Sequence, residues 1–319
     1  MADNMQPMLS VCMITYKHEH LVKQAIESIL AQKVNFPFEF VIAEDCSPDG
    51  TLEICKQYAN KYPEIIRLLP SEKNMGAVPN FCRALAACKG KYIAFCEGDD
   101  YWIDEFKLQK QVDFLEHRKD LMICFSEVKV INELDVDIPD YAVHYKEVYT
   151  IEDVILSELN IIPSPSLVFR NELPDPMPSF VYEAMSGDLS IQLLLLSKGN
   201  AGIIREKLAA YRHHAGGITK SKENIENGQR ALVKLFAAMD EYLEYRYNSS
   251  FRKRFQNIAR YNLIAGSEGL KGISKLQNYF THFRRYIKYA DKLDVREIIY
   301  YHAILFTPWL LRVRKHNNG

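Results

Sequence analysis

The stretch that decides the fold is Gly90-Lys91-Tyr92-Ile93-Ala94-Phe95-Cys96-Glu97-Gly98-Asp99-Asp100-Tyr101-Trp102. Its apolar run is typical of a strand that is buried on both faces of a sheet. Three carboxylates follow within four positions, and carboxylates crowded together repel one another unless a cation lies between them. Mg²⁺ and Mn²⁺ take oxygen ligands, often one or two carboxylates plus substrate phosphates. The stretch therefore predicts a metal-bridged nucleotide at the carboxyl end of a parallel strand.

Around this stretch the first 130 residues alternate strand and helix patterns. The expected strands are residues 9–15, 38–43, 65–69, 92–96 and 121–131, with a further short one at 167–169. Helical spacing of apolar residues is expected over 21–30, 52–59, 78–88 and 106–115, the last capped by Asp104. Alternation of this kind is typical of an α/β fold with a mainly parallel sheet flanked by helices.

The pattern changes in the second half of the chain. Residues 132–187 are less regular and are broken up by Pro163, Pro165, Pro174, Pro176 and Pro178, and residues 188–197 are expected to form a helix that starts at a carboxylate. From about residue 222 only helical spacing is found. We therefore predict an α/β domain over residues 1–220 and a helical region over residues 221–319.

Composition narrows the choice of partners and compartment. The 319 residues carry a net charge of −1. The chain therefore lacks the overall basic excess that would indicate nucleic acid as a partner. The seven cysteines include no CxxC pair, which favours reduced thiols in a cytoplasmic protein. The first seven residues lack the apolar core of a signal peptide.

The apolar segment nearest to a membrane span is residues 298–311, which His302 and Pro308 interrupt. It is shorter than the roughly 18 apolar residues that a spanning helix needs. A basic tail follows it, so this helix is expected either to dock on the protein body, which is the simpler reading, or to lie on the inner face of an anionic membrane.

Polar clusters follow three of the expected strands. They are Thr15-Tyr16-Lys17-His18, Glu44-Asp45, and Glu97-Gly98-Asp99-Asp100. Ligands of open α/β sheets bind beyond the carboxyl ends of the strands, so this convergence predicts a ligand site. The alternative for Asp99-Asp100 alone is a solvated loop with a helix cap.

These motifs resemble the family 2 glycosyltransferases of the GT-A fold, over residues 8–219. The matching segments are residues 9–16, residues 41–51, Asn74-Met75-Gly76 and Glu97-Gly98-Asp99-Asp100. Ile14 stands where that family commonly has Pro, Lys17 where it has Asn, and Glu97 where it has the first Asp of D-x-D-D. The resemblance implies a Rossmann-like GT-A sheet with a helical C-terminal extension.

The resemblance also implies a nucleotide-sugar site. Asp45 would accept a hydrogen bond from the uracil imide N–H, although a turn carboxylate is the alternative. Thr15 and Tyr16 would border the base and ribose, and Asn74 and Gly76 would close over the nucleotide, unless they form only a tight turn. Gly98 would allow close approach of the backbone. Tyr211-Arg212-His213-His214 resembles the Y-R-x-H motif that follows the last core strand in that family, and Arg212 would help to hold the phosphates.

The metal implied is Mn²⁺ or Mg²⁺, bridging the two phosphates of the donor. Asp99 would be the direct ligand, and Glu97 would bond the ribose or the water shell of the metal. His214 matches the family histidine that binds metal or pyrophosphate.

The general base implied by the resemblance is Asp188, in Ser186-Gly187-Asp188. Inverting transfer needs a base on the face opposite the leaving group, to take the proton from the acceptor hydroxyl. Gly187 stands where the family often has Glu. The alternative is that Asp188 only caps the apolar helix that follows.

We therefore expect a metal-assisted, inverting hexosyl- or N-acetylhexosaminyltransferase that uses a UDP-sugar. Its acceptor would be a glycan or a lipid-linked glycan, in bacterial polysaccharide synthesis. The alternatives are a sugar nucleotidyltransferase, whose glycine-rich loop after the first strand is missing here, and a non-catalytic nucleotide-sugar-binding subunit. Homo-oligomer formation is left open.

Overall fold

The structure is a computed structural model that describes residues 6–139, 145–213, 222–264 and 272–289. The chain forms two units, Met1–Leu235 and Phe236–Gly319, and the division between them falls inside helix α8 (Lys222–Tyr242). We call them the N-terminal and C-terminal units and describe each by itself. The domain boundary after residue 220 stays a prediction.

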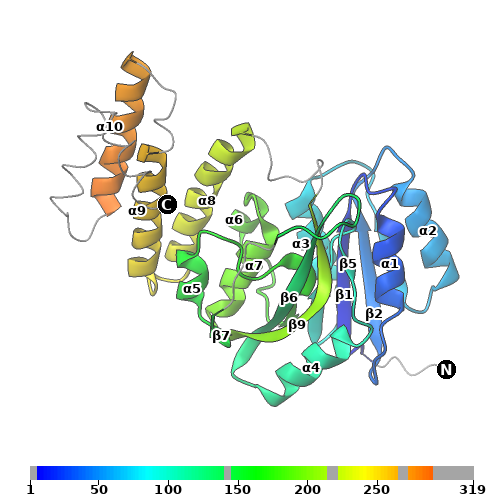
Figure 1. The fold of residues 1–319 in the computed structure, drawn as a ribbon. Coiled ribbons are helices and arrows are strands. Elements are labelled where there is room, and N and C mark those ends of the chain that lie inside the picture. The colour runs from blue at the N-terminus through cyan, green and yellow to red at the C-terminus, as the bar shows by residue number, and fades with distance from the viewer. Residues whose placement is uncertain (1–5, 140–144, 214–221, 265–271, 290–319) are drawn as a thin grey trace. The chain divides into compact units, whose positions relative to one another are not determined.

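The N-terminal unit is built on one sheet with helices packed against it (Figure 1). In this sheet β1 (Leu9–Thr15) lies between β2 (Phe38–Glu44) and β4 (Tyr92–Phe95). The strand order is β3-β2-β1-β4-β8-β6-β9-β5, with β7 paired to β9. The remaining strands are β3 (Ile66–Pro70), β5 (Tyr101–Trp102), β6 (Leu121–Asn132), β7 (Val148–Tyr149), β8 (Val168–Arg170) and β9 (Asn200–His213). Strands β3, β2, β1 and β4 are parallel, whereas β8 runs antiparallel to β4 and β6. The predicted α/β fold with a parallel sheet core is confirmed.

Helices cover both faces of this sheet. Helices α1 (Val22–Leu30), α2 (Thr51–Lys61) and α4 (Lys107–His117) share an apolar core with alternate residues of β1, β2 and β4. Helix α3 (Ala77–Ala87) packs on β1 and β2, and its Phe81 ring lies 4.4 Å from that of Phe95 in β4. Because both faces of β1 and β4 are covered, their sequences are uninterrupted apolar runs.

Short elements fill the region that was expected to be irregular. They are α5 (Ile151–Leu156), the 3-10 turn η1 (Ser164–Ser166) and α6 (Ser179–Tyr182), followed by α7 (Gly187–Leu196). Thr150 and Asp153 form a capping box at the start of α5. Asp104 was expected to cap α4, but α4 has no side-chain cap, and the Asp104 carboxylate accepts the Phe106 N–H just before the helix.

The C-terminal unit contains α9 (Asn248–Ile264) and α10 (Gly272–Tyr289), which pack against each other as the expected helical region. Among the helices of the described ranges, none combines the length and the hydropathy needed to cross a bilayer. The predicted docked or interfacial helix at 298–311 lies outside the described residues.

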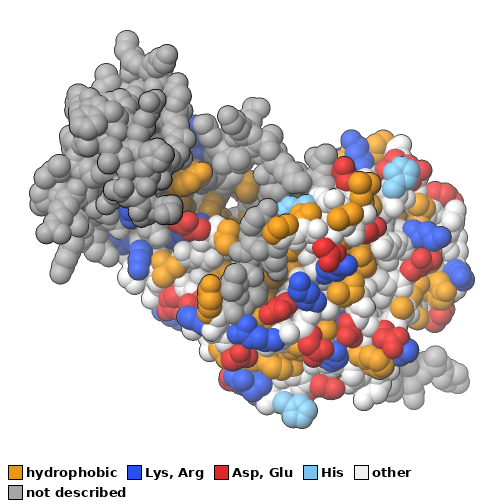
Figure 2. All heavy atoms as spheres, viewed as in Figure 1, with side chains coloured by type: hydrophobic (Ala, Val, Ile, Leu, Met, Phe, Trp, Pro, Cys, Tyr) orange, Lys and Arg blue, Asp and Glu red, His pale blue; other side chains and the backbone are white. Residues whose placement is uncertain are grey.

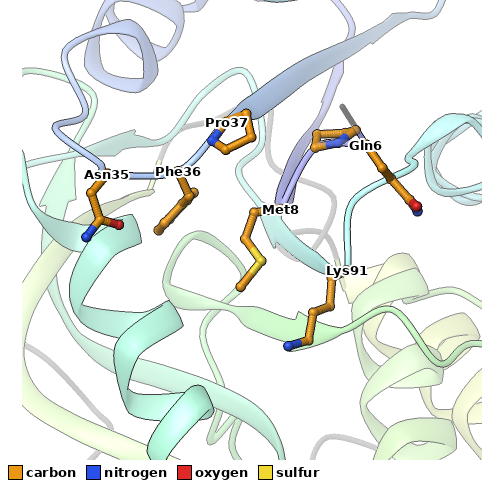
Figure 3. Close-up of a pocket in the computed structure, with 7 residues that line it drawn as sticks. Gln6, Met8, Asn35, Phe36, Pro37 and Lys91 are labelled. Carbon is orange, nitrogen blue, oxygen red and sulfur yellow. The ribbon is translucent and has the colours of Figure 1, made fainter. Parts of the chain in front are cut away.

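A hollow of about 420 Å³ lies at the amino ends of β1, β2 and β4 (Figure 3). Met8 directly precedes β1, Pro37 precedes β2 and Lys91 precedes β4. This hollow is therefore at the opposite end of the strands from the three polar clusters.

Candidate functional site

The three predicted polar clusters meet at one edge of the sheet. The pairing of Thr15 with Glu44 brings the carboxyl ends of β1 and β2 level with each other. The Asp45 N–H donates to the Thr15 carbonyl at 3.1 Å, and the Gly98 N–H donates to the Ile14 carbonyl at 3.0 Å. Backbone hydrogen bonds thus join the loops that follow β1, β2 and β4.

The two carboxylates at the end of β2 have different partners. Glu44 is buried and accepts the N–H groups of Cys46 and Ser47, at 3.1 and 2.7 Å, so it stabilises its own turn. Asp45 is 2% exposed and accepts the N–H groups of Met75 and Gly76, both at 2.9 Å. Asp45 therefore ties the predicted nucleotide loop to the end of β2.

The loop that Asp45 holds includes both predicted loop residues. Gly76 has a φ of +92°, a backbone conformation that favours glycine. The Asn74 side chain is exposed. The Asp45 oxygens keep further lone pairs, so the uracil contact of Asp45 and the closing role of Asn74 and Gly76 stay predictions.

The loop after β1 contains Tyr16, which is half-buried, and Lys17, whose φ is +58°. Asn tolerates this left-handed conformation better than Lys, which accounts for the Asn that is common at this place in the family. Thr15 is buried, and its hydroxyl lies 3.2 Å from His18 Nδ1.

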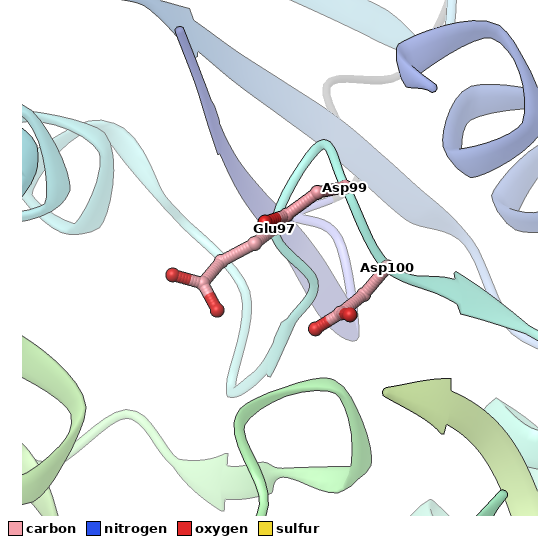
Figure 4. Close-up of side chains that lie close together, drawn as sticks. All are labelled: Glu97, Asp99 and Asp100. Carbon is pink, nitrogen blue, oxygen red and sulfur yellow. The ribbon is translucent and has the colours of Figure 1, made fainter. Parts of the chain in front are cut away.

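Glu97, Asp99 and Asp100 form a compact acidic cluster on the loop between β4 and β5 (Figure 4). One carboxylate oxygen from each lies within 4.8 Å of the others. Burial raises the pKa of Glu97 well above its usual value, and the charges of Asp99 and Asp188 raise it further. Burial also raises the pKa of Asp100, together with the charges of Asp99 and Glu97.

The cluster fits a hard divalent cation. Asp100 Oδ1 accepts the Arg212 N–H at 2.7 Å, whereas the buried Asp100 Oδ2 has no hydrogen-bond partner among the described residues. An all-oxygen donor set with mutual repulsion is the set that Mg²⁺ and Mn²⁺ prefer. His18 adds a nitrogen, since its Nε2 lies 3.8 Å from Asp99 Oδ2.

Gly98 is required by packing. A Cβ at this position would lie 2.4 Å from Thr15 Oγ1 and 3.0 Å from His18 Nδ1. The acidic loop can therefore pass this close to the end of β1 only without a side chain at residue 98.

Arg212 lies at the end of β9, and its side chain is 1% exposed. Its guanidinium donates to the Asp99 carbonyl at 2.9 Å and to Gln24 Oε1 at 2.8 Å, and it pairs with Asp135 at 2.9 Å. In this arrangement Arg212 holds the acidic loop in place. The contact of Arg212 with donor phosphates stays a prediction. To make it, the guanidinium would have to give up one or more of these bonds in favour of a phosphate oxygen.

Asp188 lies in the first turn of α7, and its charge is one of those that raise the pKa of Glu97. Asp188 Oδ2 accepts the Ser164 hydroxyl at 2.8 Å, and Oδ1 accepts the Ser186 hydroxyl and the Leu189 N–H. The expected helix start at the carboxylate was wrong, because α7 begins at Gly187 and its N-cap is Ser186. The N-cap is therefore Ser186 and not Asp188, although Asp188 also accepts one N–H of the first turn.

Ser164 and Ser186 were not identified from the sequence. Ser186 could have been found as an N-cap, because Ser before an apolar helical run is a common helix start. Ser164 belongs to η1, a separate element, and carried no such signal.

Gly187 replaces the family Glu for a steric reason. A Cβ there would lie 2.7 Å from Cδ1 of Phe81 in α3. The Phe81 ring is 2% exposed and fills the space that a side chain at residue 187 would need.

His214, the predicted third metal ligand, lies outside the described residues. Arg83, on α3, donates to the carbonyls of Glu44, Leu69 and Pro70 and to Asn80. These bonds give Arg83 a structural role at the ends of β2 and β3.

Known proteins resemble this chain over much of its length. The sequence profile described as Glycosyl transferase family 2 matches residues 10–165. An uncharacterized protein of Mycobacterium bovis is 35% identical over 67% of this chain and 61% of its own length. The putative teichuronic acid biosynthesis glycosyltransferase TuaG of Bacillus subtilis is 30% identical over 69% of this chain and 84% of its own. The chain thus spans less than two-thirds of the Mycobacterium relative.

Solved structures share the fold at low sequence identity. S. aureus TarS 1-349 in complex with UDP is 20% identical, with a TM-score of 0.58 over 89% of this chain and 81% of that one. The mannosyltransferase PcManGT from Pyrobaculum calidifontis, in complex with GDP-Man and Mn²⁺, is 14% identical, with a TM-score of 0.53 over 95% and 86%. The fold, the strand-end motifs and the identity to TuaG agree, and the chain belongs to glycosyl transferase family 2, with the GT-A fold.

Proposed function

We propose that this protein is an inverting glycosyltransferase that moves a sugar from a nucleotide-diphosphate donor, a UDP-sugar, to a hydroxyl of a glycan or lipid-linked glycan. One observation carries the proposal. One carboxylate oxygen each of Glu97, Asp99 and Asp100 lies within 4.8 Å of the others, and the charge of Asp188, which is far away in the sequence, adds to the raised pKa of Glu97. A lone carboxylate thus lies beside a carboxylate cluster that fits a divalent cation.

On the donor side, Asp45 provides the acceptor for an imide N–H, and the 74–76 loop that it holds would cover the base. Uracil and thymine share this imide, so Asp45 alone does not distinguish UDP from dTDP. The UDP bound to TarS is consistent with a uridine donor.

On the phosphate side, Asp99, Glu97 and Asp100 would hold Mn²⁺ or Mg²⁺. When bound, the metal supplies positive charge against the negative charge that builds on the leaving diphosphate. Arg212 and Gly98 keep the loop in the position that this binding needs. His214 is proposed as a further metal ligand.

On the acceptor side, the Asp188 carboxylate would take the proton of the attacking hydroxyl. The hydroxyls of Ser164 and Ser186 orient both oxygens of Asp188. A correctly positioned base contributes typically about 10²- to 10⁴-fold to the rate. The teichuronic acid named for TuaG favours a surface-polymer acceptor.

The test is release of UDP from UDP-sugars, measured with and without candidate acceptors. We expect the Asp188→Asn variant to bind UDP as the wild type does and to release it at least about 100-fold more slowly. Equal rates for the two proteins would contradict the role of Asp188. Binding of UDP without any turnover by the wild type would favour the non-catalytic subunit.

A further inference from the structure

The two units of the chain carry opposite net charge. The C-terminal unit, residues 236–319, contains 15 Lys and Arg against seven Asp and Glu, a net charge of +8. Since the whole chain has 40 basic and 41 acidic residues, the N-terminal unit has 25 against 34, a net charge of −9. Charge asymmetry of this size indicates an anionic partner for the basic part.

The excess is concentrated in two helices. Helices α9 and α10 contain eight Lys and Arg between them and no Asp or Glu. On the N-terminal unit, by contrast, acidic and basic side chains are interspersed over the face that Figure 2 shows. The basic excess of α9 and α10 is thus not the general surface pattern of this protein.

One face of α10 combines these cations with exposed apolar side chains. Phe280 is 52% exposed and Ile287 is 39% exposed, and Arg284, Arg285 and Lys288 are exposed beside them. The inner side of α10 is packed, since Tyr279 and Tyr286 are 2% and 1% exposed. We call Phe280, Arg284, Arg285, Ile287 and Lys288 the α10 face.

We propose that the α10 face docks on a lipid bilayer that contains anionic phospholipid. Cations and exposed apolar groups on one helix face are the pattern of a helix that lies in the membrane interface. Polyanions such as nucleic acid would use the cations but not the aliphatic Ile287, so the apolar pair favours the bilayer. This inference does not rest on the proposed sugar transfer.

The test is sedimentation of the full chain with vesicles, in the absence of donor. We expect binding to phosphatidylcholine vesicles that contain one-third phosphatidylglycerol, weakened by salt, and little binding to pure phosphatidylcholine. Each cation near an anionic surface is worth roughly fivefold in partitioning. The triple variant R284E/R285E/K288E should therefore lose at least about 100-fold.

A matched control separates the α10 face from net charge. The exposed lysines Lys23, Lys56 and Lys61 lie on the N-terminal unit, and K23E/K56E/K61E changes the net charge by the same amount. We expect this control to bind the vesicles nearly as well as the wild type. Equal losses in the two triple variants, or no binding by the wild type, would overturn the proposal.

A second variant tests the apolar part with all charges kept. The double variant F280A/I287A should bind phosphatidylglycerol vesicles at least severalfold more weakly and bind single-stranded RNA as the wild type does. Unchanged vesicle binding by this variant would indicate a general polyanion site and contradict docking on lipid. Circular dichroism of each variant verifies that the helices are retained.

Discussion

At the scale of single residues, two serines hold the carboxylate of Asp188 in a fixed orientation. The Ser164 and Ser186 hydroxyls donate to different oxygens of one carboxylate. A hydrogen bond to a charged group contributes about 1.5–3 kcal/mol, so each serine holds the orientation of the base measurably.

The Ser164→Ala variant should therefore lower kcat about tenfold, because Asp188 loses one of its orienting donors. KM for the donor and the affinity for UDP should not change. Ser166→Ala is the control, since Ser166 is also buried but its hydroxyl donates to the Pro163 carbonyl. A loss of kcat as large in Ser166→Ala would mean that the segment, and not the contact with Asp188, matters.

The close packing at Gly98 leads to a second prediction at the scale of single residues. In Gly98→Ala the new Cβ would meet Thr15 Oγ1 at 2.4 Å, so the acidic loop must move. We expect metal-dependent UDP binding to fall at least about tenfold. In Gly50→Ala the new Cβ meets only the carboxylate end of Glu19, a flexible side chain that can move away, so UDP binding should not change.

At the scale of elements, helix α4 contains a lysine, Lys107, whose ionisable amine is buried inside the fold. Lys107 is fully buried, and burial lowers its pKa from 10.5 to about 7. Its Nζ has no hydrogen-bond partner among the described residues and lies 4.3 Å from the centre of the Trp102 ring in β5. The ring favours the charged form, which opposes part of the burial cost.

This lowered pKa predicts a pH dependence of stability. Between pH 7 and pH 10.5 the unfolded chain keeps a proton on Lys107 that the folded chain has lost, so folding becomes more favourable as pH rises, by at most about 1.4 kcal/mol per pH unit. Lys107→Met removes the buried ionisable group, so we expect this variant to be more stable than the wild type at pH 7. The difference in free energy of unfolding should shrink from pH 7 to pH 9, because only the wild type gains stability over this range. Urea unfolding at both values measures this, and an advantage that is independent of pH would contradict it.

At the start of α7, packing against Phe81 leaves no room for a side chain at residue 187. Gly187→Ala would place a Cβ 2.7 Å from the Phe81 ring, and overpacking of this kind costs about 1–3 kcal/mol. The same change should cost less in a Phe81→Leu background, because the smaller side chain leaves room. Urea unfolding of the single and double variants measures this coupling, and strictly additive costs would contradict the steric explanation.

Elements of sufficient length were predictable from the sequence. Strands β1, β2, β4 and β6 are apolar runs, and the predicted bounds of these strands agree with the structure to within about one residue. The two-residue strands β5 and β7 and the six-residue α5 are too short for a period to be recognised. Strand β9 was missed over most of its length, because Arg205-Glu206-Lys207 interrupts its apolar residues where its pairing with β6 is irregular.

At the scale of the whole molecule, the candidate site is assembled from segments that are distant in the chain. Parallel strand order brings Thr15, Asp45 and the 97–100 loop to one edge, and this could be predicted because ligand sites follow the carboxyl ends of such strands. The contacts of Arg212 with the acidic loop and of Ser164 with Asp188 could not, because they depend on how β9 and η1 pack.

The measurement that tests the account most directly is calorimetric titration of UDP into the protein, with Mn²⁺ and again with EDTA. We predict binding that depends on the metal and that falls at least about tenfold in Asp99→Asn, because one carboxylate of the cluster loses its charge. Titrations of dTDP and GDP serve as controls for the base. Failure of UDP to bind in the presence of Mn²⁺, or equal binding by Asp99→Asn, would contradict a metal-assisted uridine nucleotide site at the acidic loop.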